Sequence, residues 1–156
     1  MSDMFDAKIA LFHQHAESKE EALKMLADEL INCGVAKDTF YNGIIEREKV
    51  FATGLTLNNM CVAIPHTDPE HVNRTQMAFM SLDTPVEFVE MGSDDKKIPV
   101  TMMFMMALKE AHQQLDMLMK LMDIFQNDEL MEKFKNVDNY EDYYALIEEA
   151  GLNIEG

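Results

Sequence analysis

The sequence of 156 residues has no tryptophan, only two cysteines and six glycines, and few basic side chains. Its 13 lysines and arginines stand against 29 acidic residues, which gives a net charge of −16. A charge of this sign opposes binding to nucleic acid and attraction to anionic lipid. We therefore expect no nucleic-acid partner, and the charge favours partners with basic docking surfaces.

The scarce residues also exclude several kinds of site. Cys33 and Cys61 lie in apolar surroundings without CxxC spacing, which predicts free buried thiols and neither a disulfide nor a zinc site. The glycines form no GxGxxG or GxxxxGK pattern, so direct binding of ATP is not expected. No Gly-x-Ser-x-Gly elbow is present for a serine nucleophile, and no cofactor is expected.

Long hydrophobic runs are missing as well. The longest, at residues 100–108, has nine residues, whereas a membrane-spanning helix needs about 20. Asp3 and Asp6 lie where a secretion signal is basic, so we expect a cytoplasmic protein without direct membrane insertion. With 47% hydrophobic residues, the chain has enough apolar material for one domain over residues 1–156.

Strand-like and helix-like segments alternate along the chain. Strands are predicted at residues 8–12, 60–64, 75–82, 86–88 and 100–108. Helices are predicted at residues 19–33 after a Ser18 cap, 39–49 after an Asp38 cap, 112–126, 128 onward, and 140–151 after an Asn139 cap. This order predicts an α/β fold, a single mixed and mostly parallel β-sheet flanked by helices on both faces.

The most informative segment is Ile64-Pro65-His66-Thr67, which follows the apolar run 60–64. Proline cannot donate a hydrogen bond to a strand ladder, so the strand is predicted to end there and to present His66 at its end. α/β proteins place reacting groups at strand ends, because the sheet holds them still while a partner can reach them. His66 is therefore the candidate nucleophile.

A metal site is an alternative reading of the same segment. The chain has five histidines, and residues 66–71 contain His66, Asp68, Glu70 and His71. His66 and His71 differ by five positions, which does not align two ligands on one helical face, and Pro69 disturbs any helix there. Surface roles are the simpler expectation for His13, His15 and His71, and we expect no metal.

Several motifs together resemble one protein family. Glu46-Arg47-Glu48 is followed by Thr53-Gly54, then by Ala63-Ile64-Pro65-His66, and later by Gln113-Gln114-Leu115 at the start of a predicted helix. Over about residues 10–150 this pattern resembles the fructose/mannitol/galactitol class of enzyme IIA, the phosphocarriers of the bacterial phosphoenolpyruvate:sugar phosphotransferase system (PTS). The galactitol type is the most similar, because of the extra residues 55–59 and the Gln-Gln-Leu element.

The resemblance implies a function and a site. His66 would accept a phosphoryl group from the phosphohistidine of HPr and pass it to a cysteine of the sugar-specific IIB component, which serves a membrane component IIC. Arg47 would steady the phosphoryl oxygens, although by sequence alone an exposed Glu-Arg pair is the more ordinary reading. Thr67 could add a hydroxyl donor, and the transported sugar would be galactitol or a related sugar or polyol.

One departure from the family pattern concerns a second active-site histidine. Many members carry it directly before a Leu-x-x-Leu element, where this sequence has Gln114, and His112 lies two positions earlier. Two residues rotate a helical side chain by about 200°, so His112 could substitute only if it preceded the first helical turn. Two other functions also stay open, a regulatory phosphohistidine switch of the same fold and a metal-dependent hydrolase.

Overall fold

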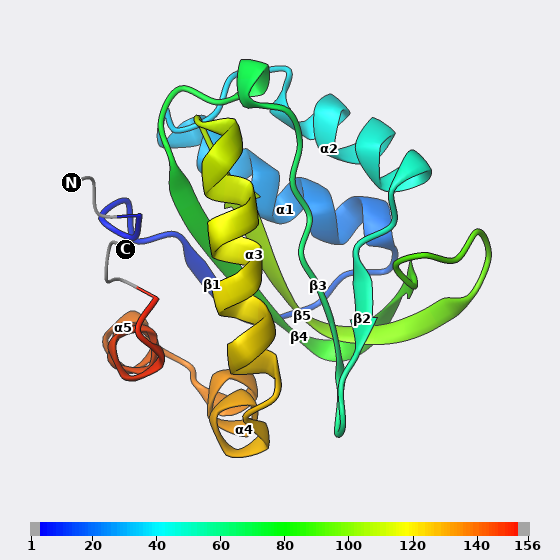
Figure 1. Ribbon diagram of the computed structural model, residues 1–156, viewed down its shortest axis with the longest axis vertical. Coiled ribbons are helices and arrows are strands. Elements are labelled where there is room, and N and C mark those ends of the chain that lie inside the picture. Colours follow the sequence, from blue (N-terminus) through cyan, green and yellow to red (C-terminus); the bar gives the residue numbers. More distant parts are fainter. Residues whose placement is uncertain (1–3, 153–156) are drawn as a thin grey trace.

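The computed structural model describes residues 4–152, apart from the side chain of Ala111, and its centre is a five-stranded sheet (Figure 1). The strands lie in the order β1-β4-β5-β3-β2. Their bounds are Ala10–Gln14 for β1, Gly54–Thr56 for β2, Cys61–Ala63 for β3, Gln76–Val89 for β4 and Lys97–Ala107 for β5. Strand β1 begins two residues later than predicted, because Lys8 has a φ of 55° in the turn after Phe5.

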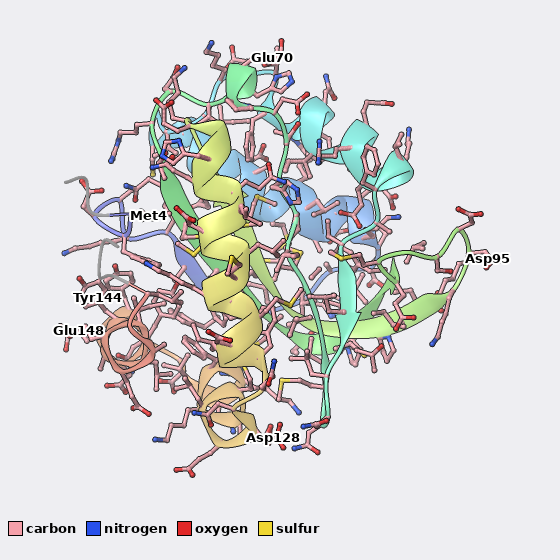
Figure 2. The ribbon with its side chains drawn as sticks, in the orientation of Figure 1. Met4, Glu70, Asp95, Asp128, Tyr144 and Glu148 are labelled. Atoms are coloured by element: carbon pink, nitrogen blue, oxygen red, sulfur yellow. The ribbon has the colours of Figure 1, made fainter. Side chains whose placement is uncertain are left out.

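The predicted α/β fold with one mixed sheet is confirmed, but parallel pairs are half of the pairings and not most of them. Strands β1 and β4 are parallel, as are β3 and β5, whereas β4 with β5 and β2 with β3 are antiparallel. The segments predicted as separate strands at 75–82 and 86–88 form the single strand β4. A short loop joins β4 to β5, and such a loop permits only an antiparallel pair; Figure 2 shows Asp95 at its tip.

The helices are α1 (Lys19–Asn32), α2 (Phe40–Val50), α3 (Ala111–Phe125), α4 (Asp128–Asn136) and α5 (Tyr140–Ala150). Ser18 and Asn139 cap α1 and α5 as predicted, through side-chain bonds from the amides of Glu21 and Asp142. The predicted Asp38 cap is wrong. Helix α2 begins after Thr39, whose hydroxyl instead contacts His71 Nδ1 at 2.8 Å.

Helices cover both faces of the sheet. Helices α1 and α2 pack on one face, around Leu26, Phe40 and Ile44, while α3, α4 and α5 pack on the other (Figure 1). Strand β5 contributes Met103 to the first cluster and Phe104 to the second. Burial on both faces explains why the sequence of β5 is a continuous apolar run without alternation.

The two cysteines differ in their exposure. Cys61 is buried as predicted, but Cys33 is exposed, because it caps the end of α1 beyond the last core-facing residue, Leu30.

Within residues 4–152, no helix has the length and apolar character needed to cross a membrane. In that part of the chain, no group of three or more His, Cys, Asp and Glu side chains is placed to hold a metal ion.

Candidate active site

His66 follows strand β3 and is tied to the central strand β5. The Met106 amide donates to the Pro65 carbonyl at 2.9 Å, and His66 pairs with Met106 as an isolated parallel bridge. Because Pro65 has no amide hydrogen, the regular ladder of β3 is interrupted there, and His66 keeps one bridge to β5 with its side chain half-buried. The backbone on both sides of the imidazole is thus held by the sheet.

Both nitrogens of the His66 ring have hydrogen-bond partners. Nδ1 lies 2.9 Å from the Ile64 carbonyl oxygen, and Nε2 lies 3.1 Å from Nε2 of Gln114 on α3. A carbonyl oxygen can only accept, so Nδ1 carries the proton and the lone pair of a neutral ring is on Nε2. Burial is the largest effect and lowers the pKa of His66 below its usual range. The hydrogen bond to the Ile64 carbonyl opposes this shift, and the smaller effects of Arg47 and Asp68 lower and raise the pKa, respectively. The neutral ring, whose Nε2 lone pair accepts a hydrogen bond from Gln114, is therefore the favoured form.

Arg47 brings a positive charge from the last turns of α2. Its Nη1 lies 3.4 Å from Oδ1 of Asp68, two residues after His66, and its guanidinium carbon lies 5.1 Å from the ring centre of Phe51. Within the described residues, the buried Arg47 Nε has no hydrogen-bond partner. A buried N–H donor without a partner is costly, so this arginine is placed to bind an additional acceptor.

Glu48, the neighbour of Arg47, is buried, and the sequence reasoning gave it no role. Its two carboxylate oxygens accept from the amide and the hydroxyl of Thr53, at 2.9 and 2.8 Å. Burial raises the pKa of Glu48, although both bonds from Thr53 oppose that shift. The sequence Glu46-Arg47-Glu48 could have indicated this burial. Adjacent residues on a helix do not share a face, so Glu48 must point in another direction than Arg47.

Hydrogen bonds connect Glu48 to the imidazole through two backbone segments. The Thr53 carbonyl accepts from the Ile64 amide at 3.2 Å, and the Ile64 carbonyl in turn faces His66 Nδ1. The end of α2, the residue before β2 and the residue after β3 are therefore joined in one chain of polar contacts that ends at the His66 ring. The same contacts set the position of α2, and with it that of Arg47.

Thr67 and His71 pack against α2 beside the site. Thr67 is buried, and a Cβ placed on Gly43 would lie only 2.8 Å from its Oγ1 and 2.9 Å from Cδ2 of His71. Gly43 therefore lets α2 approach the segment after His66. A glycine inside a helical pattern is the sequence signal for such close packing, although its importance is visible only in the structure.

The remaining predicted residues lie elsewhere. His112 is in the first turn of α3 and exposed, so Gln114 is the residue hydrogen-bonded to His66 Nε2. His13 and His15 are exposed on and after β1, where His15 contacts Glu17 and Asp83. The structure thus brings together His66, Arg47, Gln114 and Thr67 and leaves His112 at the surface.

A family model identifies the class of proteins to which this sequence is similar. The model described as "Phosphoenolpyruvate-dependent sugar phosphotransferase system, EIIA 2" matches residues 3–150. The galactitol-specific EIIA component of the PTS from Escherichia coli K12 is 27% identical over 114 residues, which cover 73% of this chain and 75% of that protein.

Solved structures agree with the family match. A PTS IIA protein from Streptococcus mutans, PtxA, superposes with a TM-score of 0.80 at 25% identity, covering 98% of this chain and 97% of that one. The IIA mannitol protein of Escherichia coli, determined in complex with phosphorylated IIB mannitol, superposes with a TM-score of 0.72 at 19% identity, covering 92% and 96%. At that identity, the second match shows the shared fold.

We expect Glu48→Gln to preserve stability at neutral pH and to change its pH dependence. The Gln amide can donate to the Thr53 hydroxyl while its carbonyl accepts from the Thr53 amide, so both contacts survive. Because burial raises the pKa of Glu48 in the folded state, wild-type stability relative to Glu48→Gln should fall as pH rises from the unfolded pKa through the folded one. Glu48→Ala should cost about 1–3 kcal/mol by leaving the Thr53 amide unpaired.

Urea unfolding between pH 4.5 and 7 measures these differences. Glu46→Gln is the matched control, since Glu46 lies exposed on the same helix, where it pairs with Lys49 at 3.5 Å. A Glu48→Gln variant as unstable at pH 7 as Glu48→Ala would contradict the expected geometry.

Proposed function

We propose that His66 is the residue on which this chain, which belongs to the EIIA 2 family of the phosphoenolpyruvate-dependent sugar phosphotransferase system, carries a phosphoryl group. The chain is a phosphotransferase, a phosphocarrier of a sugar PTS. The observation that carries the assignment of His66 is its ring geometry, in which Nδ1 is held as a donor by Ile64 and the Nε2 lone pair is directed toward Gln114.

Nε2 is the attacking atom in this proposal. The P–N bond in the phosphohistidine of HPr breaks as a P–N bond to His66 Nε2 forms, and the donor ring recovers the electron pair. Because Nδ1 keeps its proton throughout, His66 needs no base. In the second step a cysteine thiolate of IIB attacks the phosphorus, and the electron pair of the breaking P–N bond returns to Nε2. Phosphoryl transfer depends mainly on positioning and charge stabilisation.

Arg47 and Gln114 are the residues placed to assist. The guanidinium can bind phosphoryl oxygens through two forked donors, and its unpartnered Nε supports this role. Gln114 donates to Nε2 in the free protein, and its amide can turn to donate to a phosphoryl oxygen. Thr67 is buried against Gly43, where it packs the segment that follows His66 onto α2.

The partners in this proposal are HPr, a sugar-specific IIB and a membrane component IIC, and the chain works in the cytoplasm. Exposed apolar side chains at the end of α2 and along α3 support a docking surface there: Val50, Phe51, Leu115 and Met119. A protein of the same fold was determined in complex with phosphorylated IIB. The galactitol-specific relative supports galactitol or a related sugar or polyol as the transported substrate.

We expect incubation with phosphoenolpyruvate, enzyme I and HPr to add one acid-labile phosphoryl group, and His66→Ala to abolish this labelling. The matched control is His71→Ala, since His71 lies near His66 but bonds to Thr39. Phosphorus and nitrogen NMR should place the group on Nε2. Labelling that persists in His66→Ala, or that maps to His71 or His112, would remove the proposal.

Arg47→Ala should slow phosphoryl transfer by roughly 10²- to 10³-fold without unfolding the protein, because preorganised donors at developing charge are worth that much. Arg47→Lys should restore only part of the rate, since a point charge lacks the forked donors. Arg74→Ala is the control, because Arg74 pairs with Asp6 on the surface. Phosphoryl-transfer reactions quenched at timed intervals measure the rates. A wild-type rate in Arg47→Ala would show that the arginine has no role in transfer.

HPr and IIB should compete for this protein, because one imidazole must reach both of them. The net charge of −16 favours basic partner surfaces, so both complexes should weaken as salt rises. NMR titrations should shift overlapping resonances around His66, Phe51 and Leu115. Simultaneous binding at separate surfaces, or a phosphoryl group retained on His66 with cognate IIB present, would favour a regulatory switch.

A further inference from the structure

The carboxylate of Asp68 lies near the Arg47 guanidinium and two residues after His66 in the chain. Its Oδ1 lies 3.4 Å from Nη1 of Arg47, and its side chain is 62% exposed. It precedes the short turn η1 (Pro69–His71) without forming a side-chain cap there. The Asp68 carboxylate contacts Arg47, and neither burial nor a capping bond holds it in place.

The Arg47 guanidinium is held more firmly than its partner. Its side chain is 28% exposed, it lies over the Phe51 ring, and α2 is fixed through Glu48. Asp68 lies two residues after His66 and contacts Arg47, so both charges belong to the surroundings of the imidazole; Arg47 lowers the pKa of His66 and Asp68 raises it. A phosphoryl group on His66 Nε2 would thus share one cation with Asp68. Exposed ion pairs such as this one are weak and can be exchanged.

We propose that Asp68 pairs with Arg47 in the unphosphorylated protein and yields the guanidinium to the phosphoryl group, so that Asp68 sets how readily phospho-His66 gives up its group. This role rests on the proposed function of His66. Asp68 is a positioning residue here, since it acts through Arg47 and through its charge.

The proposed exchange disfavours the phosphorylated state twice. Phosphorylation removes the Arg47 contact from Asp68, and it places a group of about −1.5 to −2 charge near a carboxylate. When the P–N bond at Nε2 breaks and the S–P bond to the IIB cysteine forms, the electron pair returns to Nε2 and Asp68 recovers Arg47. Asp68 therefore favours onward transfer over retention.

The test is the equilibrium constant for phosphoryl exchange between phospho-HPr and this protein, measured by phosphorus NMR at known ratios of phospho-HPr to HPr. Asp68→Asn should raise this constant roughly three- to tenfold, because it removes a like charge and a competitor for the cation. Glu70→Gln is the matched control. Glu70 is exposed on η1, two residues further along, at the outer edge of the fold in Figure 2.

An Arg47→Ala background separates competition for Arg47 from simple repulsion between Asp68 and the phosphoryl group. In that background, Asp68→Asn should change the logarithm of the exchange constant by less than half as much as it does in the wild-type background. The reason is that the cation shared by Asp68 and the phosphoryl group is gone. An equal effect in both backgrounds, or an equal effect of Glu70→Gln, would overturn the proposal. If the wild type is phosphorylated but Asp68→Asn leaves the exchange constant unchanged, this inference alone is overturned. If the wild type is not phosphorylated, the proposed function is overturned as well.

Discussion

The hydrogen bond between His66 Nδ1 and the Ile64 carbonyl is the interaction on which the site depends. It determines which ring nitrogen carries the proton, and therefore which one has the lone pair. The Ile64 peptide cannot move freely, because its amide is bonded to Thr53 and the next carbonyl, of Pro65, is bonded to Met106. An imidazole attached to such a segment has its tautomer and orientation determined before any partner arrives. For the phosphoryl transfer proposed at His66, this preorganisation would reduce the reorganisation that the step needs.

The two side chains that flank the imidazole come from helices on opposite faces of the sheet. Arg47 belongs to α2, which packs on one hydrophobic cluster, and Gln114 belongs to α3, which packs on the other. Only at the end of a strand can side chains from both faces meet, since within the sheet the backbone separates them. The two cores therefore position the site jointly, and the close approach of α2 at Gly43 is part of that arrangement.

Charge is used unevenly across the molecule. The protein carries −16 overall, yet the immediate surroundings of His66 combine one arginine, one exposed aspartate and neutral hydrogen-bonding groups. Burial keeps the ring neutral, so its nucleophilicity does not depend on removing a proton at cell pH. The surrounding negative charge can attract basic partners, and in the proposed function the arginine would offset the negative charge of a phosphoryl group on His66.

The sequence by itself determined the α/β class, the capped N-termini of α1 and α5, a strand that stops before Pro65, and His66 as the candidate nucleophile. These features depend on local chemistry, such as the missing amide hydrogen of proline and the side-chain oxygens of Ser18 and Asn139. The tertiary structure decided the antiparallel pairing of β4 with β5, the exposure of Cys33, and the burial of Glu48 against Thr53. It also decided that Gln114 and not His112 bonds to Nε2, because that choice depends on where α3 begins and how it packs across the sheet. Contacts between residues far apart in the chain are set by packing, which local patterns do not encode.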